Sequence, residues 1–339
     1  MVDRQSVQLF FLCHDTQAER GGQRDTYQHV DDLNAAGFAA FVMHRSPGYR
    51  LTWFNNETRV TSLEMYLSIE QPAATVLVVP EDLGSNIKKL PGQKVIYNKN
   101  VFYGFFHNFA GTQSLDPYLD PSVVAVITVS DHNRRHIQFT YPHLQVFLIY
   151  PGVSTELLAR LPMHKKKKEI LMVNKALVQT RMLTQMLRIR GIQGLNTAPV
   201  FQWNVLAHYN EREAAEVIRK SCMLLYMSTE EGLGKVVVEA QMAGSIVVAF
   251  DCAPLSEVVP SKYLVRLNDL VGFCRVAEKL MSDFSQDPSM VQSDADAGHD
   301  MARRFTLEAQ RSAIARVWAE ICDIGQDLLV NGWQAKQRP

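Results

Sequence analysis

Two glutamates with a spacing suited to a long polar ligand, Glu231 and Glu239, lie on either side of a glycine-containing turn. The apolar run 223–227 predicts a short buried strand before the turn, and residues 236–243 predict a packed helix that ends at Gly244. Because a helix N-terminus carries unpaired N–H groups and a partial positive charge, the turn could receive a phosphate. Carboxylates accept hydrogen bonds from vicinal hydroxyls. The segment therefore predicts a site for a phosphate flanked by hydroxylated groups, although two solvated glutamates would also explain it.

Two cations, Lys175 and Arg181, follow the strand predicted at residues 169–173. Parallel strands end at one edge of their sheet, and open α/β folds bind ligands at that edge. Cations there would stabilise negative charge that a bound group carries or develops during a reaction. Lys175 lies nearer the strand end, whereas Arg181 fits equally well as an exposed residue of the following helix.

The composition is that of a globular protein, since 47% of the 339 residues are apolar and 21% are charged. The 35 basic and 35 acidic residues balance, so no overall field attracts nucleic acid. The run Lys165–Lys168 is expected to be a solvated linker. Contact of this run with anionic lipid headgroups is the alternative.

The cysteines and the termini bear on the cellular compartment. Five cysteines without a C-x-x-C pair indicate buried, reduced thiols. The N-terminal residues do not resemble a signal peptide, and no apolar run reaches the ~18 residues of a membrane span. We therefore expect a cytoplasmic protein, for which the lysine run leaves peripheral contact with the inner face of the membrane open.

The chain divides into two α/β series. Residues 1–150 alternate apolar strands with helical segments, the pattern of a parallel sheet covered on both faces. A second series covers residues 151–305, and residues 306–339 hold a final helix, expected over 307–324, and a tail. The expected strands are 7–13, 39–43, 75–79, 94–97, 123–129 and 145–150 in the first series, and 169–173, 199–203, 223–227, 246–250 and 263–265 in the second.

Gly21 and Gly22 follow the first predicted strand, ahead of a helix expected from about Asp25. Glycines allow a ligand to approach the backbone closely, so their N–H groups could contact a diphosphate or a sugar. A glycine pair also simply shapes a turn.

Four residues after the strand 94–97 could face an acceptor: Asn98, Asn100, Tyr103 and His107. A polar loop with aromatic packing explains them nearly as well, and a lone histidine is more often structural than an acid or base. Glu81, at the end of the preceding strand, could also touch an acceptor hydroxyl.

The segment Glu231–Phe250, E-G-L-G-K-V-V-V-E-A-Q-M-A-G-S-I-V-V-A-F, resembles the E-G-x-G-x-x-x-x-E-A-M-A-x-G signature of glycosyltransferase family 4. Q-M stands where the common form has M-A. Gly21-Gly22 with its helix, V-S-D-H-N-R-R from Val129 and I-Y-P-G-V from Ile149 are similar to further elements of the family. The resemblance covers most of residues 7–325.

This resemblance implies the GT-B fold, in which two Rossmann-like, doubly wound domains face each other across a cleft and the last helix crosses back. Members bind a nucleotide-sugar donor in the C-terminal domain and the acceptor mainly against the N-terminal one. The family usually places an arginine before a lysine after the 169–173 strand, an order that is reversed here. The implied donor contacts are Glu231 to the sugar, Glu239 to the ribose, and Lys175, Arg181, Gly21, Gly22, Gly232, Leu233, Gly234 and Lys235 to the diphosphate or sugar.

The expected function is retaining, metal-independent transfer of a sugar, without a cofactor, to a hydroxyl of a glycan, lipid-linked or small-molecule acceptor, in glycan biosynthesis. Asp294-Ala295-Asp296 matches the D-x-D pattern that can bind a metal ion, but its polar surroundings predict a loop or helix cap. The loop 251–257 departs from the glycine-rich form common in the family. A non-catalytic GT-B protein that binds a nucleotide or glycan, or a sugar-nucleotide epimerase or phosphorylase on the same scaffold, remains an alternative.

Overall fold

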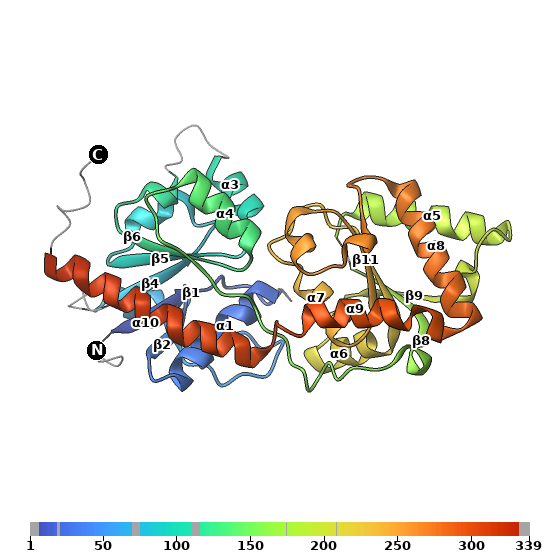
Figure 1. The fold of residues 1–339 in the computed structure, drawn as a ribbon. Coiled ribbons are helices and arrows are strands. Elements are labelled where there is room, and N and C mark those ends of the chain that lie inside the picture. Colours follow the sequence, from blue (N-terminus) through green and yellow to red (C-terminus); the bar gives the residue numbers. More distant parts are fainter. Residues whose placement is uncertain are drawn as a thin grey trace. The chain divides into compact units, whose positions relative to one another are not determined.

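The computed structural model describes residues 7–18, 21–69, 75–109, 116–173, 175–207 and 209–331. The chain forms two compact units (Figure 1). The first unit comprises Met1–Pro151 with Glu308–Pro339, and the second comprises Gly152–Leu307. Each unit is built on its own parallel sheet with helices packed against it, so the predicted α/β class with two Rossmann-like domains is confirmed.

The sheet of the first unit has the strand order β3-β2-β1-β4-β5-β6-β7, and every pairing is parallel. Gln8 of β1 pairs with both Ala39 of β2 and Thr75 of β4, so the strand order reverses next to β1. In open α/β sheets, ligands bind beyond the carboxyl ends of the strands at such a switch point. The strands are β1 (Gln8–Leu12), β2 (Ala39–His44), β3 (Val60–Ser62), β4 (Thr75–Pro80), β5 (Gln93–Asn98), β6 (Val123–Thr128) and β7 (Val146–Leu148).

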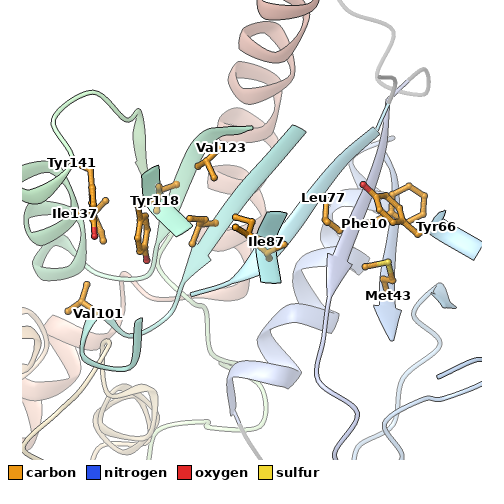
Figure 2. Packing of buried hydrophobic residues seen from close by; sticks show 13 residues of the cluster. Phe10, Met43, Tyr66, Leu77, Ile87, Val101, Tyr118, Val123, Ile137 and Tyr141 are labelled. Carbon is orange, nitrogen blue, oxygen red and sulfur yellow. The ribbon is translucent and has the colours of Figure 1, made fainter. Parts of the chain in front are cut away.

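The helices of this unit connect the strands and cover the sheet. They are α1 (Gly21–Ala35), α2 (Leu63–Leu67), α3 (Val101–Phe109), α4 (Asp131–Thr140) and α10 (Leu307–Asn331), with the short 3-10 turns η2 (Gly84–Lys89) and η3 (Pro117–Leu119). Figure 2 shows part of the core between sheet and helices. Phe10 meets Tyr66 edge to face at 5.1 Å between ring centroids, and Tyr118 stacks on Tyr141 at 4.7 Å. Large side chains from separate elements therefore interlock in one core.

The C-terminal helix α10 packs on the first unit and makes polar contacts with α1. Trp318 Nε1 donates to His29 Nε2 at 2.7 Å, and Arg311 Nε donates to Asp32 Oδ1 at 2.8 Å. Because His29 Nε2 accepts this bond, its proton lies on Nδ1. Burial lowers the pKa of His29 to about 3, so the imidazole stays neutral. The helix is thereby fixed to α1. Among the described residues, every helix is too short or too polar to span a bilayer.

The sheet of the second unit has the order β12-β11-β10-β8-β9, again with every pairing parallel. Its strands are β8 (Lys167–Val173), β9 (Gln202–Leu206), β10 (Ser221–Tyr226), β11 (Ile246–Phe250) and β12 (Leu264–Val265). Its helices are α5 (Leu177–Ile192), α6 (Glu211–Lys220), α7 (Lys235–Met242), α8 (Leu270–Gln286) and α9 (Gln292–Ala302), with 3-10 turns η4 (Met163–Lys165), η5 (Ala198–Val200), η6 (Ala253–Glu257), η7 (Ser261–Tyr263) and η8 (Pro288–Val291).

Several local predictions were wrong. Strand β3 was not predicted, because it is only Val60–Ser62 and lacks a long apolar run. The strand expected from Pro199 begins at Gln202, since Pro199 belongs to η5. Asp294 and Asp296 lie inside α9 and not in a loop. These polar residues occupy a helix whose opposite side is buried, so tertiary packing overrides their local preference.

The lysine run is also not a uniform solvated linker. Lys166 is 7% exposed, and its Nζ donates to the Arg219 carbonyl at 2.9 Å and to Ser245 Oγ at 3.0 Å. Burial lowers the pKa of Lys166 to about 7. Lys167 and Lys168 begin β8 and are exposed. The run therefore contributes one structural lysine to the second unit.

Candidate functional site

The turn between β10 and α7 requires glycine at its last position. Gly234 is the N-cap of α7 with φ +85°, in the left-handed region that favours glycine. A Cβ at this position would lie 2.7 Å from Leu255 Cδ2, which is part of η6. The Gly234 carbonyl accepts from Val237 N at 2.9 Å. The helix start is thus held by backbone conformation and close packing together.

The Glu231 carboxylate is buried in a polar cluster beside this turn. Lys175 Nζ and Tyr226 OH both donate to the same oxygen, Glu231 Oε1, and Lys175 Nζ lies 3.3 Å from Tyr226 OH. The Lys175 side chain is 46% exposed, whereas that of Glu231 is 6% exposed. A cation that reaches solvent therefore holds a buried carboxylate at the carboxyl edge of the sheet, between β8 and β10.

Tyr226 is a member of this cluster that sequence reasoning missed. It ends β10, is fully buried, and directs its hydroxyl to Glu231. Burial and then the Glu231 charge raise the pKa of Tyr226 well above its usual value, so the phenol stays protonated and donates. The only signal for it is a hydroxyl at the end of an otherwise apolar run.

The other predicted donor residues of the second unit are placed as follows. Gly232 and Leu233 are buried in the turn, and Lys235 and Glu239 lie one helical turn apart on the partly exposed side of α7. Arg181 is exposed on α5, and within the described residues no hydrogen bond or ion pair joins it to the Glu231 cluster. The structure thus brings Lys175 to Glu231 and leaves Arg181 on the surface.

The loop that departs from the glycine-rich form closes the other side of the turn. Cys252 is 4% exposed, and burial, with the neighbouring Glu231 and Glu230 charges, raises the pKa of its thiol to about 11. Leu255 follows in η6 and packs on Gly234. This loop supports the turn with apolar and thiol groups.

Gly21 and Gly22 lie in the first turn of α1, because this helix begins at Gly21 and not near Asp25 as predicted. Lys99 reaches them from the end of β5. Its Nζ donates to Thr26 Oγ1 at 2.8 Å, and a Cβ on Gly22 would lie 3.2 Å from Lys99 Cδ. A helix N-terminus and a lysine are therefore adjacent at the switch point of the first unit.

The predicted acceptor residues are mostly engaged in structural contacts. Asn98 is fully buried and bonds Tyr118 OH at 2.7 Å and Asn133 Nδ2 at 3.0 Å. Asn100 N donates to Glu81 Oε1 at 2.9 Å, and Asn100 Oδ1 accepts from Phe102 N. Asn98 thus ties the end of β5 to η3 and α4, and Asn100 fixes the start of α3.

Tyr103 is 48% exposed on α3, so its ring is available at the surface of the first unit. His107 belongs to α3, but its side chain lies outside the described residues. Glu81 is 6% exposed, and burial raises the pKa of its carboxyl, an effect opposed by the charge of Lys99.

Among the described residues, no group of three or more His, Cys, Asp or Glu side chains could hold a metal ion. Both aspartates of the D-x-D sequence in α9 form ion pairs, Asp294 with Lys262 and Asp296 with Arg160. They therefore tie α9 to neighbouring segments of the second unit.

No protein-family model and no curated protein match this sequence. Solved structures do. A glycosyltransferase from Rickettsia africae ESF-5 has a TM-score of 0.60 at 13% identity, covering 94% of this chain and 99% of that one. Sucrose-phosphate synthase from Thermosynechococcus elongatus has a TM-score of 0.64 at 13% identity over 94% and 99%. HepE from Anabaena, solved with UDP and glucose, has a TM-score of 0.61 at 12% identity over 93% and 100%.

At these identities the similarity shows the fold. The expected GT-B class, with two Rossmann-like domains on parallel sheets, is confirmed by the neighbours and by the strand orders. Membership of glycosyltransferase family 4 stays a prediction, because a fold hosts many activities and the site must be argued separately.

Proposed function

We propose that this protein transfers a sugar from a nucleotide diphosphate sugar to an acceptor hydroxyl. The observation that carries this proposal is the Lys175–Glu231–Tyr226 cluster beside the N-terminus of α7. A carboxylate that can accept from sugar hydroxyls and a cation that can meet phosphate are then in direct contact beside one helix start. HepE, a structural neighbour, is solved with UDP and glucose, which supports a donor of this class.

In this proposal the cluster and the neighbouring residues of the turn and α7 hold different parts of the donor. The backbone N–H groups from Gly232 to Lys235 and the Lys175 ammonium hold the diphosphate, Glu231 accepts from the transferred sugar, and Glu239 accepts from the ribose. Lys175 already contacts Glu231, so the arriving phosphate shares or takes over this cation. Charge that develops on the leaving diphosphate is then stabilised in place, which is where electrostatic catalysis acts.

The resemblance to glycosyltransferase family 4 supports three finer proposals. The sugar is transferred with retention, as the acceptor attacks from the face that the diphosphate leaves and the leaving phosphate oxygen assists. Lys175 and the α7 N-terminus neutralise the diphosphate, so a divalent ion is not required. The acceptor is a glycan, a lipid-linked or a small-molecule hydroxyl, and glycan biosynthesis is the proposed setting.

A second candidate is a GT-B protein that binds a nucleotide or glycan without turnover, as the partner of an active transferase. The observations that favour it are the exposed position of Arg181, away from the cluster, and the buried Cys252 loop in place of glycines. Such a protein would keep the donor site and lack part of the catalytic charge. Binding and turnover must therefore be measured separately.

Thermal unfolding with UDP-, GDP- and ADP-linked hexoses tests the binding step. One of these donors at about 100 times its Kd should stabilise the wild type by about 2.7 kcal/mol. Glu239→Ala and Lys175→Ala should reduce this stabilisation, whereas Lys167→Ala, a change at an exposed lysine of β8, should not. A wild type that no nucleotide sugar stabilises contradicts the proposal.

Turnover is tested by incubating the stabilising donor with a panel of hydroxyl acceptors and analysing the products by mass spectrometry and NMR. A glycoside with the donor's anomeric configuration supports retaining transfer, and the activity should persist with a chelator present. Stabilisation without any product would favour the binding protein, while an epimerised donor without a glycoside would favour the epimerase.

A further inference from the structure

Helix α5 of the second unit has apolar side chains on two opposite faces. Leu183 and Leu187 are fully buried against the unit. On the other face, Val178 is 66% exposed, Met182 50%, Ile189 44% and Ile192 84%. Their spacing of i, i+4, i+11 and i+14 places them in one stripe along the helix. A surface helix of a globular protein normally turns polar residues to solvent, whereas this apolar stripe is left uncovered by the described residues.

The charges on this stripe all have one sign. Arg181 and Arg188 lie at i+3 and i+10, next to the apolar side chains, and both are exposed. The sequence contains no Asp or Glu between Glu169 and Glu211. The third arginine of α5, Arg190, is turned to α8 and pairs with Glu278 at 2.6 Å. The chain as a whole is neutral, so this cationic, apolar face is a local feature.

The face continues beyond the helix and onto its neighbour. Leu195 and Val200 follow α5 and are 55% and 57% exposed. α8 packs beside α5 (Figure 1), and a hydrogen bond of 3.5 Å joins Gln179 to Asn268 just before it. Leu267 and Val271 near this contact are 42% and 52% exposed. Exposed apolar side chains are thus present both on α5 and at the start of α8, where the exposed carboxylate of Asp269 lies between Leu267 and Val271. α5 itself carries arginines and no carboxylate.

We propose that the outer face of α5 docks on a membrane surface rich in anionic lipids. Interfacial helices of this kind insert apolar side chains at the headgroup boundary and pair their cations with lipid phosphates. A second copy of the chain fits less well. A twofold interface would set the face against itself and bring arginines together without carboxylates to pair with them. This inference does not depend on the proposed sugar transfer.

Another exposed apolar side chain provides a matched control. Phe139 on α4 of the first unit is 91% exposed, but Arg134 and Arg135 of that helix both pair with Asp131. Exposure of a large apolar group is therefore present there without free positive charge. If apolar exposure alone produced membrane binding, Phe139→Glu would reduce it.

The test is co-sedimentation of the full chain with vesicles of phosphatidylglycerol and phosphatidylcholine, compared with pure phosphatidylcholine. We expect binding to the anionic vesicles only, weakened by salt. Ile189→Glu with Ile192→Glu, and separately Arg188→Glu, should lower the partition coefficient about tenfold or more, because apolar insertion and charge attraction are lost. Phe139→Glu and Lys167→Glu with Lys168→Glu should bind as the wild type does.

Folding is checked for every variant by its thermal unfolding midpoint, and Ile192→Ser is a milder replacement if the double variant is unstable. Three results would overturn the proposal. They are no binding of the wild type to anionic vesicles, equal binding of the α5 variants, and loss of binding only in the Lys167 and Lys168 variant. A dimer in analytical ultracentrifugation that the α5 double variant dissociates would also overturn it, since a second copy would then cover the face.

Discussion

Each unit presents a helix that starts with glycine beside a lysine from the end of a strand, but the two arrangements are built differently. At α7, Gly234 has φ +85° and no room for a Cβ, and Lys175 contacts the buried carboxylate of Glu231. At α1, Gly21 would have open space around a Cβ, and Lys99 contacts the neutral hydroxyl of Thr26. The glycine is thus required by the fold in one unit and not in the other.

The carboxylates near the two lysines also differ in their contacts. Glu231 accepts hydrogen bonds from a cation and a phenol, so direct charge-assisted contacts hold its carboxylate in place. Glu81 is buried and accepts from a backbone N–H, and burial raises its pKa despite the nearby Lys99. The second unit therefore holds an ionic cluster, whereas in the first unit Lys99 bonds the neutral hydroxyl of Thr26. A ligand anion would meet a pre-formed cluster only at α7.

The largest expected difference is in the free energy of unfolding when each of the two glycines is replaced by alanine. Gly234→Ala should lower the free energy of unfolding by about 3 kcal/mol, because a left-handed residue and an overpacked Cβ each cost one to a few kcal/mol. Gly21→Ala should change it by less than about 1 kcal/mol, since alanine is a better helix former and meets nothing there. Urea unfolding of both variants measures the contrast. Equal losses would mean that the two turns do not differ as described.

The two lysines should differ in catalysis. If Lys175 stabilises the leaving diphosphate, Lys175→Met should reduce kcat/KM roughly 100-fold, the effect of removing one charge-stabilising donor. Lys99→Met should reduce it less, because Lys99 is bonded to Thr26 and has no ionic contact with a site carboxylate in the described structure. Steady-state kinetics with the donor identified by thermal unfolding compares them. A larger reduction of kcat/KM in Lys99→Met than in Lys175→Met would show that the catalytically important cation belongs to the first unit.

The same comparison shows which features of the two sites could be predicted from the sequence. The apolar run 223–227 and the helix-forming run 236–243 before Gly244 predicted the strand, turn and helix, because buried strands and helix ends leave local patterns. Tyr226 was not predicted although its partner Glu231 follows only five residues later, because an apolar run does not show which way a phenol points. Lys175 joins the cluster because β8 lies next to β10. The start of α1 was also missed, because a glycine pair usually indicates a turn before a helix, whereas here Gly21 and Gly22 form its first turn.

The buried asparagines that were predicted to face the acceptor substrate also show that long-range contacts could not be predicted from the sequence. Asn98 follows a strand end, where sequence favours a ligand contact, but Tyr118 and Asn133 from other elements use its amide. Arg181 has the spacing of a site cation and instead lies on the exposed stripe of α5. Periodicity identifies elements and their edges, while the side chains that meet at an edge depend on long-range packing.

Tyr226→Phe should have a smaller effect that is specific to the α7 cluster. Loss of a buried hydrogen bond to a charged group costs about 1.5–3 kcal/mol, and the fully buried ring keeps its packing. If Tyr226 positions Glu231, kcat should fall more than KM rises, because the sugar end is disturbed while Lys175 still holds the diphosphate. Donor thermal shifts, kcat and KM are measured together. Tyr118→Phe, which removes a buried phenol that bonds Asn98, is the control in the first unit and should lower stability with little change in kcat.

The smallest expected effect is at Glu81. Its raised pKa means that the folded protein holds this proton more tightly than the unfolded chain does. The stabilisation from the protonated carboxyl is complete below the unfolded pKa and is lost as pH rises through the folded pKa. Glu81→Gln keeps an acceptor for Asn100 N and carries no charge, so its advantage over the wild type should grow with pH. We expect a gain in Tm of at most about 4 °C at pH 8, since about 1 kcal/mol moves the Tm of a domain of this size by 2–4 °C. The same comparison at pH 4 should give no gain. A Tm that falls at pH 8 would show that Lys99 needs the Glu81 charge, and the first unit would then hold an ionic pair as the second does.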